Sequence, residues 1–128
     1  MYRPYNPNPA QSRVGDCVIR AISKATAQDW EKTYVDLALQ GLIMHDMPSA
    51  NHVWGQYLRG RGFVRHPIPD ECPDCYTLGR FCADHPRGTY VVAVDKHVIC
   101  VVDGDHYDTW DSSQEVPMYY WEKDGVDE

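Results

Sequence analysis

The fold is decided by residues 89–111, TYVVAVDKHVICVVDGDHYDTWD. Runs rich in Val, Tyr and Trp have the composition of β-strands, and such runs dominate the C-terminal part of the chain. They are Thr89–Asp95, His97–Val102, His106–Asp111 and Val116–Trp121. Asp103-Gly104 separates the second run from the third, and an Asp-Gly pair in this position is a strong signal for a β-hairpin. The sequence therefore predicts an antiparallel sheet of about four strands.

The chain before this sheet has the spacing of helices. Apolar residues recur at helical intervals, and capping residues stand near the expected ends. The predicted elements are a helix from Cys17 capped by Asp16, a helix from Thr26 or Asp29 to Gly41, a helix capped by Ser49 and stopped by Gly60, and a short helical turn over Thr77–Asp84. Because helices come first and antiparallel strands second, the predicted fold class is α+β.

Length and charge limit the possible functions. The 128 residues fit one domain, 1–128, in which residues 1–13 form an extended arm because Pro4, Pro7 and Pro9 disfavour a helix or a central strand. The 19 acidic and 12 basic residues give a net charge of −7, so a nucleic-acid partner is not expected. The sequence contains neither an apolar run of about 20 residues nor the apolar core of a signal peptide. We therefore expect a cytoplasmic protein without membrane contact.

Cys17 is the candidate nucleophile. It stands at a predicted helix N-terminus, where the helix dipole and unpaired N–H groups favour the thiolate, the reactive form of cysteine. The alternative interpretation is that Cys17 is a small buried apolar residue. Gln11 is close enough along the chain for its amide to donate a hydrogen bond to an oxyanion beside the thiol, and Asn8 is a weaker candidate for that role.

His97 and Asp111 are the candidate partners of this thiol. His97 opens an apolar strand, where a polar ring needs a partner, and Asp111 lies on the adjacent strand. The register of the hairpin decides whether they meet. A two-residue loop places Trp110 opposite His97, whereas a three-residue loop places Asp111 there. A catalytic pair requires the second register, and Asp108 is the rival acid.

The order of these residues resembles that of papain-like cysteine peptidases: Gln-x5-Cys at the start of a helix, then His on one strand and Asp on the next. Within that superfamily the layout is most similar to small bacterial peptidases of the bacteriocin-leader-processing (double-glycine) type. The segments GDCVIRAI (15–22) and YDTWDSS (107–113) are also similar to short bacterial and phage proteins. The resemblance implies a papain-like fold in which the nucleophile helix comes first and packs on the sheet.

The same resemblance assigns a role to each candidate residue. Cys17 would be the nucleophile, and His97 the general base and later the general acid. Asp111 would orient the imidazolium, while Gln11 and the backbone N–H of Cys17 would hold the oxyanion. The implied reaction is hydrolysis of a peptide or isopeptide amide in a peptide or protein substrate, with no cofactor. Acyl transfer to an amine is a variant that the sequence does not separate from hydrolysis.

A second group of residues has the spacing of metal ligands. Cys72 and Cys75 form a Cys-x2-Cys pair, and Cys82 and His85 form a Cys-x2-His pair. Two such pairs have the ligand count of a closed, structural zinc site. The alternative interpretation places Cys82 in the packing of a short helix and the other three residues in solvated loops.

Two other functions are compatible with the sequence. A catalytically silent papain-like or zinc-stabilised module could bind a partner protein without turnover. A metal-dependent enzyme could use the acidic residues around the hairpin. Chemical labelling of Cys17 separates these possibilities, because a nucleophilic thiol reacts far faster than a buried one.

Overall fold

Four helices and six strands make up the part of the chain that the computed structural model describes, residues 1–69 and 76–123. The helices are α1 (Cys17–Thr26), α2 (Trp30–Met44), α3 (Asn51–Gly60) and α4 (Leu78–Asp84). The strands are β1 (Tyr2–Pro4), β2 (Phe63–Pro67), β3 (Thr89–Val94), β4 (His97–Val102), β5 (Asp105–Asp108) and β6 (Tyr119–Lys123). The fold class is α+β, as the sequence predicts.

The strands form one mixed sheet in the order β1-β5-β4-β3-β6-β2. Neighbouring strands run antiparallel except for β1 and β5, which pair in parallel. The prediction of about four strands is thus corrected to six. The two additional strands are β1, inside the proline-rich arm, and β2, which ends at Pro67. Both lie at the sheet edges, where proline is tolerated because one side of the strand has no partner to which it must donate.

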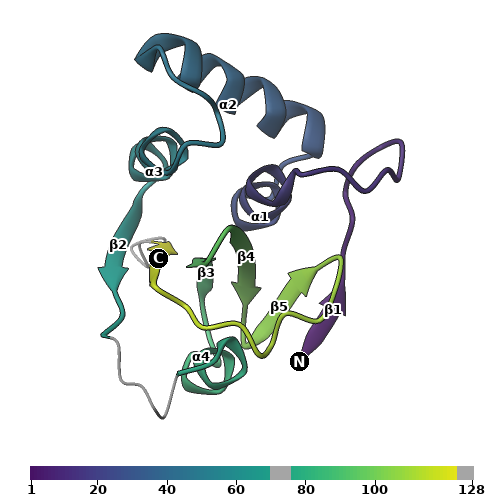
Figure 1. The fold of residues 1–128 in the computed structure, drawn as a ribbon, viewed down its shortest axis with the longest axis vertical. Helices are drawn as coiled ribbons and strands as arrows, with labels where there is room; N and C mark the ends of the chain where they lie inside the picture. The colour runs from purple at the N-terminus through teal and green to yellow at the C-terminus, as the bar shows by residue number, and fades with distance from the viewer. Residues whose placement is uncertain (70–75, 124–128) are drawn as a thin grey trace.

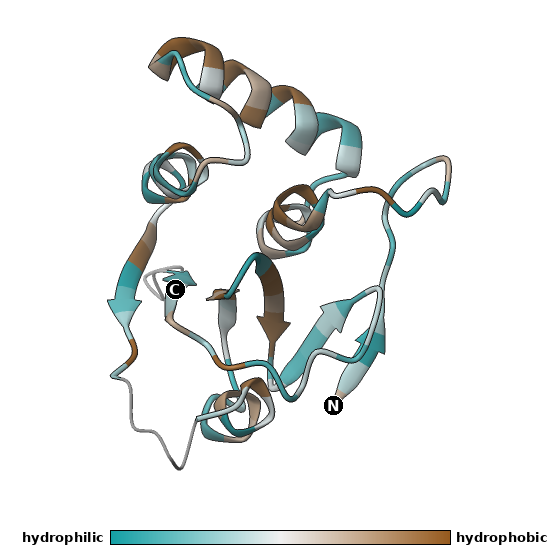
Figure 2. Cartoon of the chain, in the orientation of Figure 1, coloured by the Kyte–Doolittle hydropathy of each residue, from teal (hydrophilic) through white to brown (hydrophobic). Residues whose placement is uncertain are grey.

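Helices cover both faces of the sheet (Figure 1). α1 and α3 pack on one face and α2 packs on these two helices, around a core that includes Ile22, Leu37 and Trp54. α4 packs on the other face, where Phe81 contacts a second core. Figure 2 shows the apolar strand β4 between these helices. The run Tyr90–Val94 of β3 is buried throughout, which is the pattern of a strand covered on both faces.

The ends of α2 show how local signals compete with packing. Asp29 caps the helix, because its carboxylate accepts a hydrogen bond of 2.7 Å from the backbone N–H of Lys32. The helix does not end at Gly41, as predicted, but continues to Met44. Gly41 instead permits a close approach, since a Cβ at this position would lie 2.6 Å from the carbonyl oxygen of Asp46. Glycine is therefore required here inside the helix and not beyond its end.

Gly55 in α3 fixes the distance between this helix and the sheet. A Cβ at Gly55 would lie 2.9 Å from Cζ2 of Trp121, a side chain that is only 3% exposed. We expect Gly55→Ala to lower the free energy of unfolding by about 1–3 kcal/mol, because the buried indole cannot move aside without strain. Urea denaturation followed by circular dichroism measures this change.

Gly60→Ala, in the same helix, is the matched control. A Cβ at Gly60 would meet no atom within 4 Å, so alanine should leave stability unchanged or raise it through its better helix propensity. Equal unfolding midpoints for the two variants would contradict the packing of α3 on Trp121.

Candidate active site

Cys17 and His97 line one cleft of the protein. Cys17 is the first residue of α1, and His97 is the first residue of β4. The cleft has a volume of about 410 Å³, and its walls also include Ser49, Asp95 and Met118. Because α1 packs directly on β4, the predicted nucleophile and the predicted base lie in one site.

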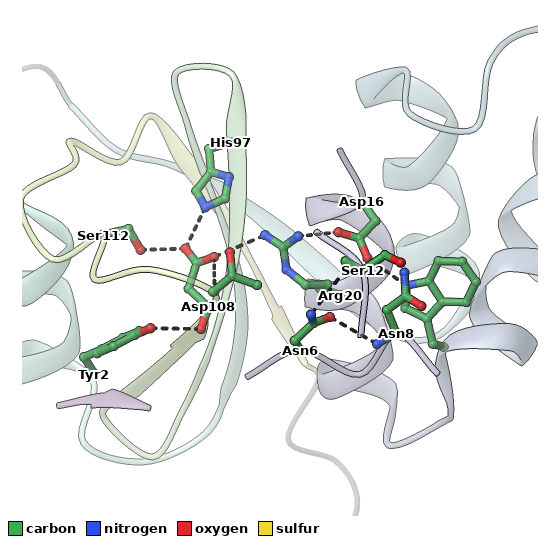
Figure 3. A network of polar contacts seen from close by, with 11 residues as sticks. Tyr2, Asn6, Asn8, Ser12, Asp16, Arg20, His97, Asp108 and Ser112 are labelled. Carbon is green, nitrogen blue, oxygen red and sulfur yellow. Dashed lines mark hydrogen bonds and ion pairs between the residues drawn. The ribbon is translucent and has the colours of Figure 1, made fainter. Parts of the chain in front are cut away.

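Asp108, the last residue of β5, is the acid that contacts His97. The Nε2 atom of His97 lies 2.6 Å from Oδ2 of Asp108, whose side chain is 1% exposed (Figure 3). The hydroxyl of Ser112 donates to the same oxygen at 2.8 Å. Oδ1 accepts from the backbone N–H of Thr109 at 2.8 Å and from Arg20 at 3.2 Å. These four donors hold the carboxylate of Asp108 in one orientation. Because His97 bonds to Asp108 through Nε2, its Nδ1 atom takes no part in that bond.

Asp111 does not contact His97. Its carboxylate lies 3.2 Å from Nε2 of His106 and is largely exposed. The hairpin has the two-residue loop, with positive φ at both Asp103 (49°) and Gly104 (82°), so the register expected for an Asp111 pair is not the one formed. In the observed register Trp110 comes next to His97, and the two rings stack with centroids 5.1 Å apart.

Arg20 connects Asp108 to the start of α1, the helix that begins at Cys17. It forms ion pairs with Asp16 and with Asp108, and the side chains of all three residues are at most 7% exposed (Figure 3). The second carboxylate oxygen of Asp16 accepts a hydrogen bond of 2.8 Å from the indole N–H of Trp30. The carboxylate of Asp16, which precedes Cys17 in the chain, is thus paired with Arg20. Its negative charge therefore disfavours the Cys17 thiolate less than an unpaired carboxylate would.

The electrostatics of the cleft favour an ion pair between Cys17 and His97. Burial by itself raises the pKa of the Cys17 thiol, but His97, the backbone of Val98 and the charge of Arg20 outweigh it, and the pKa is lowered from 9.0. Burial lowers the pKa of His97, but Asp108 and Cys17 act in the opposite direction and raise it to about 9. A thiolate beside an imidazolium is the reactive state of a cysteine nucleophile.

The other cysteines that the structure describes differ from Cys17. Cys82 and Cys100 are buried in the two cores, and burial raises the pKa of each thiol. A raised pKa keeps them protonated at neutral pH and chemically inert. Within residues 1–69 and 76–123, Cys17 is the cysteine whose surroundings lower the thiol pKa.

Gln11 does not contribute to the cleft. Its side chain is exposed, and its amide donates to the carbonyl oxygens of Asn6 at 3.2 Å and Asn8 at 2.9 Å. Asn8 is itself buried, and its Oδ1 accepts from the backbone N–H of Ala10. The donors beside the thiol are instead backbone N–H groups in the first turn of α1, which the Asp16 side chain does not cap.

The candidate zinc ligands are described only in part. Cys72 and Cys75 lie outside the described residues. Cys82 packs in the core with its Sγ 4.0 Å from Nδ1 of His106, while Nδ1 of His85 donates to the carbonyl oxygen of Phe81 at 2.8 Å. Among the described side chains, no three His, Cys, Asp or Glu residues converge as a metal site. The zinc site therefore stays a prediction.

The sequence favoured Asp111 over Asp108 as the acid and gave no indication of Ser112. The two-residue loop favoured by Asp-Gly, which places Trp110 opposite His97, is the register that forms. Asp108 is then the next residue on the same side of its strand, diagonal to His97. Ser112 follows the strand in an irregular segment, so no periodicity predicts its position.

No protein-family model, curated protein or solved structure matches the chain. In the described parts of the chain, none of the helices is both long and apolar enough to span a bilayer. The function must therefore be inferred from the site itself.

Proposed function

We propose that this protein is a papain-like cysteine hydrolase that cleaves a peptide or isopeptide amide through a Cys17–His97–Asp108 triad. One observation carries the proposal: Nε2 of His97, in the cleft that Cys17 lines, lies 2.6 Å from a buried Asp108 carboxylate. Thiol hydrolases require a nucleophile, a base that contacts it and an acid that orients the base. Asp108 takes the role that the sequence assigned to Asp111.

The first half of the reaction is acylation. The Cys17 thiolate attacks the amide carbonyl carbon, a C–S bond forms, and the carbonyl electrons move to oxygen. The imidazolium of His97 then gives its proton to the amide nitrogen, the C–N bond breaks, and the amine leaves. In the second half, His97 takes a proton from water, the hydroxide attacks the thioester, and the C–S bond breaks to release the acid and restore the thiolate.

Each remaining group has a defined part in this chemistry. Asp108 holds the ring orientation and stabilises the imidazolium in both halves. The backbone N–H groups of Cys17 and Val18 are the donors for the oxyanion, because the Asp16 side chain leaves the first turn of α1 uncapped. The proposed reaction needs no cofactor, takes a peptide or protein substrate and involves no nucleic acid. A reducing cytoplasm would keep the thiol active.

A brief pulse of dilute iodoacetamide at pH 7 tests the proposal. We expect intact mass to show rapid single labelling of the wild-type protein, and peptide mapping to place the label on Cys17. Labelling should disappear in Cys17→Ala and slow by about tenfold or more in His97→Ala, because the thiolate loses its counter-ion.

His52→Ala is the matched control for the histidine variant. His52 is exposed on α3 and pairs with Asp46 at 2.7 Å, so its loss should leave the labelling rate unchanged. Labelling of the wild type no faster than a free model thiol would overturn the hydrolase proposal. The domain would then be a binding module without turnover.

A further inference from the structure

A second hollow, of about 430 Å³, lies between α3 and the strands β2 and β6. We call it the arginine pocket, because Arg59 and Arg65 stand in its wall. Asn51 lines both this pocket and the cleft of Cys17, and Met118 of the cleft precedes Tyr119 of the pocket in the chain. The two hollows therefore adjoin each other along one surface.

Both arginines of the pocket lie over aromatic rings. The guanidinium carbon of Arg65 is 4.0 Å from the ring centre of Tyr119, and that of Arg59 is 5.1 Å from the ring centre of Trp121. Arg65 is the cross-strand partner of Trp121, which places these side chains on the same face of the sheet. A guanidinium that lies on a ring keeps the N–H groups at its edge available for a ligand.

Neither arginine is neutralised by a carboxylate of the described chain. The ion pairs formed by residues 1–69 and 76–123 include neither Arg59 nor Arg65. Arg59 donates to Gln56 at 3.3 Å, which is a neutral acceptor. Two cations without a carboxylate partner among residues 1–69 and 76–123 are a local exception in a chain with a net charge of −7.

Packing behind the pocket holds its donors in place. The ring of Tyr119 stacks on buried Trp54 with centroids 6.4 Å apart. The indole N–H of Trp54 donates to Oδ1 of Asn51 at 3.2 Å, so the amide N–H₂ of Asn51 is not used by this bond. Asn51 lines the pocket where it meets the cleft, and its N–H₂ group is a donor that a ligand could use there. His52 is held by Asp46, so its ring is already partnered.

We infer that the arginine pocket binds an acidic side chain of the peptide whose amide is placed at Cys17. This inference rests on the proposed function, since it assigns a specificity to the same site. A carboxylate accepts two parallel hydrogen bonds from the edge of a guanidinium, so Arg65 and Arg59 would select Asp or Glu over neutral residues. The net negative charge of the chain disfavours the binding of acidic peptides elsewhere on its surface. We therefore expect the acidic side chain to bind at the arginine pocket.

Binding to the inactive Cys17→Ala variant tests the inference independently of turnover. The probe is acetyl-Glu-Glu-Glu-amide, with acetyl-Gln-Gln-Gln-amide as its neutral match, followed by NMR titration of ¹⁵N-labelled protein. We expect the glutamate peptide to shift the indole N–H signal of Trp121 and to bind at least about tenfold more weakly when Arg65→Gln or Arg59→Gln is added. Arg87→Gln, an exposed arginine outside the pocket, should leave the affinity unchanged.

The outcomes separate this inference from the hydrolase proposal. Equal binding of the two peptides, or equal affinities of the Arg65→Gln and Arg87→Gln variants, overturns the acidic subsite even if Cys17 is rapidly alkylated. Inorganic phosphate that binds as tightly as the glutamate peptide also overturns it, in favour of a general anion site. Binding that depends on Arg65 supports the subsite even if alkylation of wild-type Cys17 is slow.

Discussion

Asp108→Asn should lower the pKa of His97 from about 9 toward its ordinary value of 6.5 and slow the alkylation of Cys17 at pH 7 by about tenfold or more. The carboxylate is the main group that raises this pKa, and without it the burial of the ring favours the neutral imidazole. A neutral ring stabilises the thiolate less, so the pKa of Cys17 rises and the thiolate fraction at neutral pH falls. NMR titration of the imidazole and the pH dependence of alkylation measure both shifts.

Asp111→Asn is the control for this variant. Asp111 also follows His97 in the hairpin, but its carboxylate contacts His106 and is largely exposed. We therefore expect no change in the alkylation rate and none in the pKa of His97. A larger effect from Asp111→Asn than from Asp108→Asn would show that the hairpin has the other register in solution.

Arg20→Met should lower the free energy of unfolding by about 3–5 kcal/mol, the usual cost of removing one partner from a buried ion pair. Asp16 and Asp108 would each lose a cation while their side chains stay 4% and 1% exposed. Methionine has a similar length and fills the space, so the loss reports charge and not a cavity. Guanidinium denaturation followed by circular dichroism gives the free energy of unfolding.

Arg87→Met is the matched control for the loss of an arginine. Arg87 is exposed, and within residues 1–69 and 76–123 its side chain forms no ion pair. Its replacement should change stability by no more than about 0.5 kcal/mol. Equal stabilities of the two variants would mean that Arg20 does not bridge the two carboxylates.

The sequence was sufficient for those elements whose signals are local. The strands around residues 89–108 have apolar runs and an Asp-Gly turn, and both features act within a few residues. Asp29 caps α2 and Thr77 precedes α4 in the same way, because a cap depends only on the next turn of the helix. The α+β class follows directly from the order of these elements.

The remaining features depend on contacts between distant segments. β1 and β2 are edge strands whose own sequences are short and end in proline, so the pairing with β5 and β6 decides their structure. The choice between Asp108 and Asp111 depends on one residue of hairpin register. Gln11 adopts a positive φ of 57° in the arm, and its amide is bound by local carbonyl groups that no periodicity indicates.

The ion pair between Arg20 and Asp108 joins residues that are 88 positions apart. During synthesis, Cys17 therefore leaves the ribosome long before His97, whose ring lowers the pKa of the Cys17 thiol in the folded protein. Until the C-terminal hairpin closes onto α1, Cys17 is an ordinary thiol with no imidazolium beside it. Under the proposed function, Cys17 would gain its reactivity only after this hairpin has closed, and the appearance of fast alkylation would mark the completion of folding.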